Sequence, residues 1–146
     1  MKNMGNRHLF RGKRTDNGEW VEGSLVTGVF FRLGQEIPYM FCPNLADYDC
    51  FEDFSEENGI FEVDPSTICQ CTGLKDKNGR VIWENDIANC IDAECCGYIS
   101  WNESEAGFYF DVLLEDGRFE EEHIYDYQDC MEVIGNIFDN PELLEV

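Results

Sequence analysis

Residues 72–87 of the chain read TGLKDKNGRVIWENDI, and they predict a compact β framework. Asn78-Gly79 is the strongest short hairpin signal in this stretch, because both residues accept the positive φ of a type I′ turn. The β-prone segment Val81-Ile82-Trp83 follows the turn. In a second turn Asn85 tolerates left-handed φ before a strand resumes at Ile87. Two turns and three short strands within about twenty residues therefore organise the chain.

Within this stretch we assign structural rather than chemical roles to a set of turn and strand residues. Glu84 and Asp86 are expected to bond backbone amides, as turn carboxylates do. The full set is Thr72, Gly73, Leu74, Asp76, Asn78, Gly79, Glu84 and Asp86.

Strand and turn signals continue on both sides of this stretch. Asp16-Asn17-Gly18 predicts a turn, so residues 9–26 are expected to form a first hairpin. Pro38 is expected to restrict its strand to a sheet edge. Residues 119–125 predict an acidic edge strand, and residues 131–137 alternate as a final core strand. About ten short strands with almost no helical period predict a mainly β fold.

The length of 146 residues fits one compact domain or two small lobes. We place a boundary at Asp64-Pro65, which separates an N-terminal β lobe, residues 1–65, from a barrel-like part, residues 66–146. No Gly/Ser-rich linker lies between them, so the two lobes are expected to pack closely.

Several blocks of the sequence resemble a known family. Beside the central stretch, the blocks are Phe10–Lys13, Trp20–Leu25, Gly97–Trp101, Ala106–Tyr109 and Val133–Leu144. Together they resemble the YopX family, small proteins found mainly in phages and prophages. The resemblance implies a mainly β protein with an SH3-like barrel in its C-terminal part, and it implies no catalytic residue. The family usually has Gly where this chain has Asn85, a replacement that a positive-φ turn tolerates.

The net charge of −21 is distributed unevenly. Residues 1–20 hold five bases and two acids, whereas residues 87–146 hold sixteen acids and one base, Arg118. Direct nucleic-acid binding by that acidic half is excluded, because such binding needs Lys and Arg to neutralise phosphates. One interpretation is that the charge keeps an acidic protein soluble. The alternative is an acidic surface that engages a basic partner, in one version by imitating DNA.

Eight cysteines raise the question of disulfides or zinc, but their spacing is poor for both. There is no Cys-x-x-Cys pair, and Cys69-x-Cys71 and Cys95-Cys96 are poor tetrahedral ligands. The first residues lack the apolar core of a signal peptide, and no apolar run reaches the length of a membrane span. We expect reduced thiols, no metal, no cofactor, no membrane association and a location in the bacterial cytoplasm.

The sequence lacks the standard catalytic motifs. His123 beside Glu120–Glu122 is the most site-like cluster, and the simpler interpretation of it is a solvated edge strand. We assign a peptide-recognition groove to four aromatic residues, the competing interpretation being that most of them belong to the core. They are Trp83, Trp101, Tyr109 and Tyr125.

The sequence thus favours a non-enzymatic protein-binding module of phage or prophage type. Its partner is an unidentified protein, basic if the acidic surface is functional, or further copies of the chain itself. Two alternatives stay open: a DNA-mimicking acidic inhibitor of a host nucleic-acid-binding protein, and a small enzyme. The enzyme would use carboxylates and His123 on a cationic or metal-bound substrate.

Overall fold

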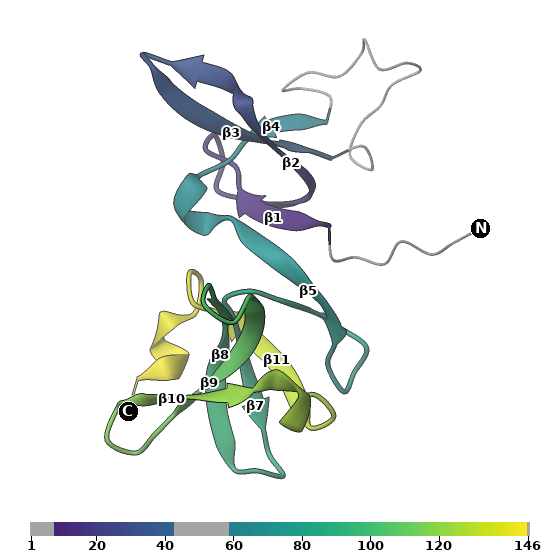
Figure 1. Ribbon diagram of the computed structural model, residues 1–146, viewed down its shortest axis with the longest axis vertical. Coiled ribbons are helices and arrows are strands. Elements are labelled where there is room, and N and C mark those ends of the chain that lie inside the picture. The colour runs from purple at the N-terminus through teal and green to yellow at the C-terminus, as the bar shows by residue number, and fades with distance from the viewer. Residues whose placement is uncertain (1–7, 43–58, 146) are drawn as a thin grey trace, which may run out of the picture. The chain divides into compact units, whose positions relative to one another are not determined.

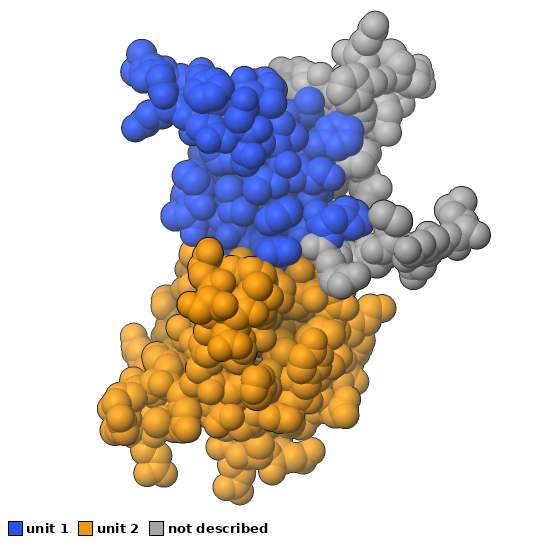
Figure 2. Space-filling view, viewed as in Figure 1, with its two compact units in different colours: residues 1–70 blue, residues 71–146 orange. Residues whose placement is uncertain are grey.

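The computed structural model describes residues 8–42 and 59–145. These residues form antiparallel β-strands and short 3-10 helices, with no α-helix in the described ranges (Figure 1). The predicted mainly β class is confirmed. The chain divides into two compact units, residues 1–70 and residues 71–146 (Figure 2), which we call unit 1 and unit 2. The domain boundary placed at Asp64-Pro65 and the close packing of two lobes stay predictions.

Unit 1 contains four strands of its own, which lie in the order β4-β3-β2-β1. They are β1 (Phe10–Lys13), β2 (Trp20–Arg32), β3 (Gln35–Phe41) and β4 (Ile60–Glu62). A fifth strand, β5 (Cys69–Lys75), pairs with β1 through Cys69 and Gln70. The hairpin predicted for residues 9–26 is confirmed, because β1 pairs with β2 and Gly18 has a φ of 73° in the connecting turn.

The edge position predicted for β3 is wrong, since this strand pairs with β2 on one side and β4 on the other. Pro38 is accommodated by a β-bulge in β2. The β2–β3 register shifts between the pairs Val26↔Tyr39 and Phe30↔Ile37, so Pro38 lies opposite the bulge. A bulge is one of the few places in a sheet interior where a residue without an N–H is tolerated. On the side of β3 that faces β4, the Pro38 carbonyl accepts the N–H of Val63 at 3.1 Å.

The core of unit 1 is small and comes from three strands and the residues beside them. Its buried members are Val21, Met40, Cys42, Phe61 and Val63. A 3-10 helix, η3 (Pro65–Thr67), then leads the chain toward β5. Asp64 caps it by accepting the N–H of Ser66 at 3.0 Å, and the Thr67 hydroxyl accepts the N–H of Lys13 at 2.9 Å.

Unit 2 contains the remaining elements. They are β6 (Val81–Trp83), β7 (Asp86–Cys90), β8 (Cys95–Asn102), β9 (Gly107–Leu113), β10 (Phe119–His123), η4 (Ile124–Asp126), β11 (Met131–Asn136) and η5 (Pro141–Leu144). Five of them form a sheet in the order β10-β9-β8-β7-β11, while β6 pairs with β5. In the described ranges the sheet does not close into a barrel, so the predicted SH3-like barrel is not confirmed.

The core of unit 2 lies on one face of that sheet. Ile99 faces Phe110 across β8 and β9, and both side chains are fully buried. The core also contains Ile82, Ala88, Cys90, Val112, Ile124, Met131 and Val133. The alternation predicted for residues 131–137 holds at Met131 and Val133, which are buried, whereas Ile134 is exposed.

The type I′ turn predicted at Asn78-Gly79 is wrong in its type, although the hairpin between β5 and β6 exists. Gly79 has a φ of 81°, but Asn78 is absent from the described residues with positive φ. The N–H of Gly79 donates to the Asp76 carbonyl at 3.0 Å, and the N–H of Asp76 donates to the Arg80 carbonyl at 2.8 Å. The loop is therefore longer than two residues, and it needs left-handed backbone only at Gly79.

The Asp76 carboxylate explains why the longer loop is preferred. It accepts the backbone N–H groups of Asn78 and Arg80 at 2.9 Å and that of Val133 at 3.0 Å. The residue is 6% exposed. Burial alone would raise the pKa of this carboxyl, but the hydrogen bonds from Val133, Arg80 and Asn78 outweigh burial and lower the pKa. One side chain thus joins the β5–β6 loop to β11.

The turn before β7 agrees with the sequence prediction. Asn85 has a φ of 70°, and its carbonyl accepts the N–H of Ile137 at 3.0 Å. The buried carboxylate of Asp86 accepts the N–H of Trp83 at 2.8 Å. Thr72 also bonds to the backbone, but as a donor: its buried hydroxyl donates to the Ile82 carbonyl at 2.6 Å. Thr72, Asp76, Asn85 and Asp86 therefore connect neighbouring parts of the β framework.

Candidate functional site

The outer half of the β2–β3 hairpin exposes a group of large apolar side chains. Val29 and Phe31 are 63% and 60% exposed, and Leu33 is 100% exposed. Phe30 is also exposed and lies against Tyr39 with the ring centroids 4.4 Å apart. We call Val29, Phe30, Phe31 and Leu33 the hairpin tip. Solvent-exposed apolar groups of this size, when they lie together, typically mark an interaction site.

The strand pairing isolates this ribbon from the rest of its sheet. In the described part of the chain, β1 pairs with β2 only as far as Gly23, and β4 pairs with β3 only as far as Tyr39. Beyond these residues β2 and β3 pair with each other alone, and Figure 1 shows them projecting from unit 1. A two-stranded ribbon is marginally stable unless something covers it.

The apolar residues of the tip emerge from both faces of the ribbon. Phe30 pairs with Ile37 and Phe31 with Glu36, and successive residues of a strand point to opposite faces. Packing one face against the body of the unit would therefore still leave the other face exposed. Both faces would be covered only by a surface that receives the end of the ribbon.

The turn at the end of the ribbon is itself strained. Leu33 and Gly34 form a two-residue loop closed by the pair Arg32↔Gln35, and their φ angles are 52° and 81°. Positive φ at both central residues is the requirement of a type I′ turn, where Asn or Gly is usual and an apolar residue such as Leu is uncommon. A fully exposed Leu at such a position contributes little to packing. Unfavourable backbone of this kind is concentrated at functional sites.

A pocket of about 270 Å³ opens beside the tip, and we call it the hairpin pocket. It is slightly smaller than the roughly 300–1,000 Å³ of small-molecule sites. Its apolar lining comes from Leu33, Ile37, Pro38, Val63 and Pro65. Its polar lining comes from Thr15, Arg32, Gln35, Glu36 and Glu62.

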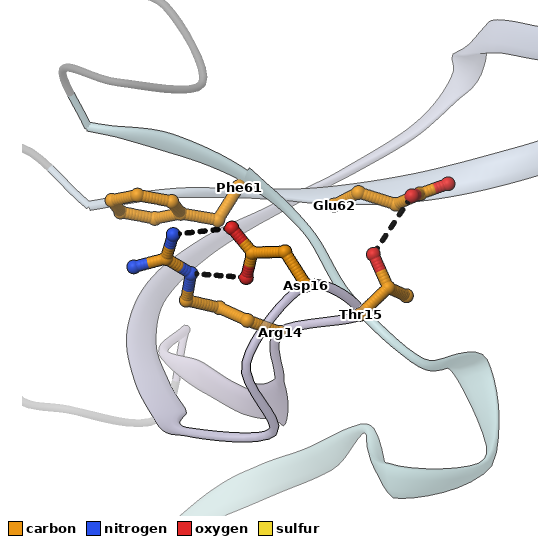
Figure 3. A pocket seen from close by; sticks show the side chains of 5 residues that line it. All are labelled: Arg14, Thr15, Asp16, Phe61 and Glu62. Atoms are coloured by element: carbon orange, nitrogen blue, oxygen red, sulfur yellow. Dashed lines mark hydrogen bonds and ion pairs between the residues drawn. The ribbon is translucent and has the colours of Figure 1, made fainter.

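A smaller pocket of about 80 Å³ adjoins it, and Figure 3 shows the five residues that line it. The Arg14 guanidinium lies 4.2 Å over the Phe61 ring and forms two hydrogen bonds with Asp16, at 2.9 and 2.6 Å. The hydrogen bond between them raises the pKa of Arg14 and lowers the pKa of Asp16. The guanidinium is thus held by both a ring and a carboxylate.

Glu62 connects the two pockets, because it lines both of them together with Thr15. Its carboxylate accepts the Thr15 hydroxyl at 2.8 Å, drawn as a dashed line in Figure 3, and pairs with Arg32 at 3.0 Å. The polar groups beside the apolar tip are therefore held in place by contacts within the chain.

The four aromatic residues assigned to a recognition groove do not come together in one place. Trp83 is 6% exposed on β6, and Tyr125 is 76% exposed in η4. Trp101 pairs with Phe108, and Tyr109 pairs with Ser100. Because neighbouring residues alternate between faces, Trp101 and Tyr109 lie on opposite faces of the sheet.

His123, the centre of the most site-like sequence cluster, is an exposed residue at the end of β10. Its ring lies against that of Tyr109, with centroids 5.3 Å apart, and the Tyr109 hydroxyl donates to Glu105 at 3.4 Å. β10 pairs with β9 and ends the sheet, as an edge strand does. The predicted edge strand is therefore present over residues 119–123, whereas Ile124 and Tyr125 belong to η4 and Ile124 is buried in the core.

Within residues 8–42 and 59–145, no group of three or more His, Cys, Asp or Glu side chains is arranged to hold a metal ion. The seven cysteines in these ranges are free thiols, and Cys50 lies outside them. None of the helices in the described ranges is both long and apolar enough for a membrane span.

The sequence-based predictions did not identify the hairpin tip. The available signal was Val29-Phe30-Phe31, three consecutive large apolar residues in a strand, which cannot all face one core. The second signal was Gly34, one residue after Leu33, where a two-residue hairpin loop would require positive φ.

The fold and its candidate site thus define a small all-β protein with an exposed apolar hairpin. The chain matches the family model described as YopX protein over residues 9–145 and belongs to the YopX family. The resemblance found in the sequence is therefore confirmed over nearly the whole chain. Comparison with curated proteins gives no match.

Proposed function

We propose that this protein is a non-enzymatic binding module that inserts its hairpin tip into an apolar cleft on another protein. The observation that carries the proposal is the exposure of Val29, Phe31 and Leu33 at the end of a ribbon that projects from its sheet. The strained Leu33 turn and the adjoining hairpin pocket support the same function. A partner side chain would occupy this pocket while the tip enters the partner.

The charge distribution supports a partner whose cleft has a basic rim. Glu36 and Glu62 line the hairpin pocket beside the tip. The whole chain carries a net charge of −21, so a positively charged surface would associate with it faster than a neutral or acidic one. A second copy of the chain carries the same negative charge, which makes self-association through the tip less favourable.

Two further parts of the proposal concern unit 2 and the setting. We infer that unit 2 is an open variant of a small SH3-like barrel, supported by a four-stranded meander from β7 to β10 and by β11, which returns to pair with β7. We also place the protein in the bacterial cytoplasm as a phage- or prophage-encoded accessory protein, supported by what the family resemblance implies.

The experiment is quantitative affinity capture from bacterial lysate with matched surface variants. The test variant is Phe31→Ser combined with Leu33→Ser, and the control is Ile91→Ser, which removes an exposed apolar residue of unit 2. We expect at least a tenfold loss of one captured protein with the tip variant and unchanged capture with the control. Circular dichroism of each variant verifies that the fold is retained.

Equal capture by the tip variant and the wild-type chain would contradict the proposal. Capture of only the chain's own copies, with a matching change in oligomeric state, would replace the partner protein by a dimer. Loss of capture in both variants would show that the tip has no special role.

A further inference from the structure

Three thiols converge at one end of the unit 2 core. The Cys90 and Cys130 thiols both donate to the Tyr127 carbonyl oxygen, with sulfur–oxygen distances of 3.6 and 3.3 Å. The Cys90 thiol also interacts with those of Cys95 and Cys130, and burial together with these contacts raises its pKa. Cys90 is fully buried, whereas Cys95 and Cys130 are partly exposed. We call Cys90, Cys95 and Cys130 the thiol cluster.

The backbone places two members of the cluster at disulfide distance. Cys90 and Cys95 are directly opposite partners in the antiparallel pair of β7 and β8, at the last pair before the connecting turn. Directly opposite residues in antiparallel strands have Cα atoms roughly 4.5–5.5 Å apart. Disulfides span roughly 4.4–6.8 Å between Cα atoms, so no strand has to move to link these two.

Cys96, the next residue along β8, offers a natural contrast. Because neighbouring residues of a strand point to opposite faces, its side chain lies on the other side of the sheet from that of Cys95. Its thiol contacts the Leu143 carbonyl at 4.0 Å, and it pairs across the sheet with Asn89, which has no thiol. Cys96 therefore has similar exposure but no thiol opposite it.

We propose that the thiol cluster is an oxidative modification site in which Cys90 and Cys95 form a disulfide when the protein meets a low-molecular-weight disulfide. The partly exposed Cys95 thiol, whose pKa is also raised by burial, loses its proton and attacks one sulfur of an oxidant such as oxidised glutathione. A mixed disulfide forms on Cys95, and one glutathione leaves as a thiol. The Cys90 thiol then loses its proton and attacks the Cys95 sulfur as a thiolate, which releases the second glutathione; this step is slow near neutral pH because burial raises the pKa of Cys90. The two protein thiols are oxidised, one disulfide is reduced to two thiols, and both protons end on glutathione.

Cys130 has a separate part in this reaction. It shares the Tyr127 carbonyl with Cys90 and lies one residue before Met131, the residue that pairs with Cys90 in β11. It is therefore close to Cys90 without being its direct cross-strand partner. Oxidation joins β7 to β8 covalently at the end of the core beside Cys130, so the oxidised protein is expected to melt at a higher temperature than the reduced protein.

The test uses the full chain incubated with oxidised glutathione, followed by digestion with a glutamyl endopeptidase without reduction. Cleavage after Glu94 separates Cys90 from Cys95, so a disulfide between them appears as two linked peptides in mass spectrometry. Cys96 shares the peptide of Cys95, so the Cys96→Ser variant assigns the linkage. We expect the linked peptides, and a loss of two thiols per chain, in the wild-type protein and in Cys96→Ser.

The Cys95→Ser variant distinguishes a specific disulfide between Cys90 and Cys95 from unselective oxidation of the thiols. It is expected to lose the linked peptides while Cys96 stays as available for alkylation as in the wild-type protein. A linkage from Cys90 to Cys130 would overturn the assigned pair. Two results would overturn the proposal as a whole. One is a glutathione adduct that does not proceed to a disulfide within the protein, and the other is oxidation of Cys96 before any thiol of the thiol cluster.

Discussion

At the scale of single residues, the central stretch acts through backbone geometry rather than chemistry. Gly79 and Asn85 both hold left-handed backbone, with φ angles of 81° and 70°. Both positions could be predicted from the sequence, because Gly and Asn are the residues that tolerate this region. The contacts of Asp76 could not be predicted, since its bond to Val133 joins residues 57 positions apart.

Replacing Gly79 by Ala tests the role of this backbone conformation. A Cβ at Gly79 would meet nothing within 4 Å, so the effect isolates conformational strain from steric overlap. We expect a loss of about 1–2 kcal/mol in the free energy of unfolding, measured by urea denaturation. Gly107→Ala is the matched control, because Gly107 lacks positive φ and its added Cβ would make ordinary contacts. Equal effects of the two substitutions would contradict this account.

Replacing Asp76 by Asn tests the role of the buried carboxylate. The amide group cannot accept all three backbone N–H groups, so we expect a loss of about 2–3 kcal/mol near neutral pH. Asp116→Asn is the control, because Asp116 accepts the N–H of Arg118 in an exposed turn, and it should change stability by less than about 0.5 kcal/mol.

The pH dependence of the Asp76 effect has a defined sign. The pKa of this carboxyl is lower in the folded chain than its ordinary value. Its contribution is therefore present above the unfolded pKa, about 3.9, and is lost as the pH falls through the lower folded value. The difference in unfolding free energy between wild type and Asp76→Asn should shrink as the pH is lowered below about 4. A difference that stays constant or grows would contradict the assignment.

At the scale of elements, the hairpin tip is expected to contribute to binding and hardly at all to stability. Phe31→Ser combined with Leu33→Ser removes side chains that are at least 60% exposed, so the unfolding free energy should change by less than about 1 kcal/mol. Fluorescence of an apolar dye such as anilinonaphthalene sulfonate should fall at the same time. A large loss of stability would show that the tip packs within its own chain.

Elements were easier to predict than their details. Strands and their order along the chain follow from β-prone segments between Gly, Asn and Asp turns, which is local information. The two-residue turn lies at Leu33-Gly34 and not at Asn78-Gly79, because Asp76 closes the latter loop through side-chain contacts. Pro38 lies inside a sheet because a bulge in β2 faces it, and a bulge depends on the register of two strands.

At the scale of the whole molecule, charge should govern both stability and association. A net charge of −21 repels itself in the compact state, and added salt screens that repulsion. We expect the melting temperature to rise by a few degrees between about 10 mM and 300 mM sodium chloride. Potassium chloride should raise the melting temperature by the same amount, because screening depends on ionic strength and not on which monovalent cation is used. A falling melting temperature would show that favourable ion pairs outweigh the repulsion.

The mainly β class and the family could be predicted at this scale, whereas the site was missed, although Val29-Phe30-Phe31 and Gly34 were signals of it. Strand content and sequence blocks are distributed along the whole chain, so they are visible without coordinates. A surface depends on which residues remain uncovered. Trp83 is buried and Phe31 is exposed, although each ends a run of three β-prone apolar residues.

The most direct test of the account is photocrosslinking from the hairpin tip in living bacterial cells. A benzophenone amino acid replaces Phe31 in one variant and Phe119, an exposed Phe on β10, in the other. The account predicts one discrete crosslinked product of higher mass from position 31 and none of that mass from position 119. The same product from both positions, or none from position 31 while the protein is folded, would contradict the claim that the hairpin tip is the docking element.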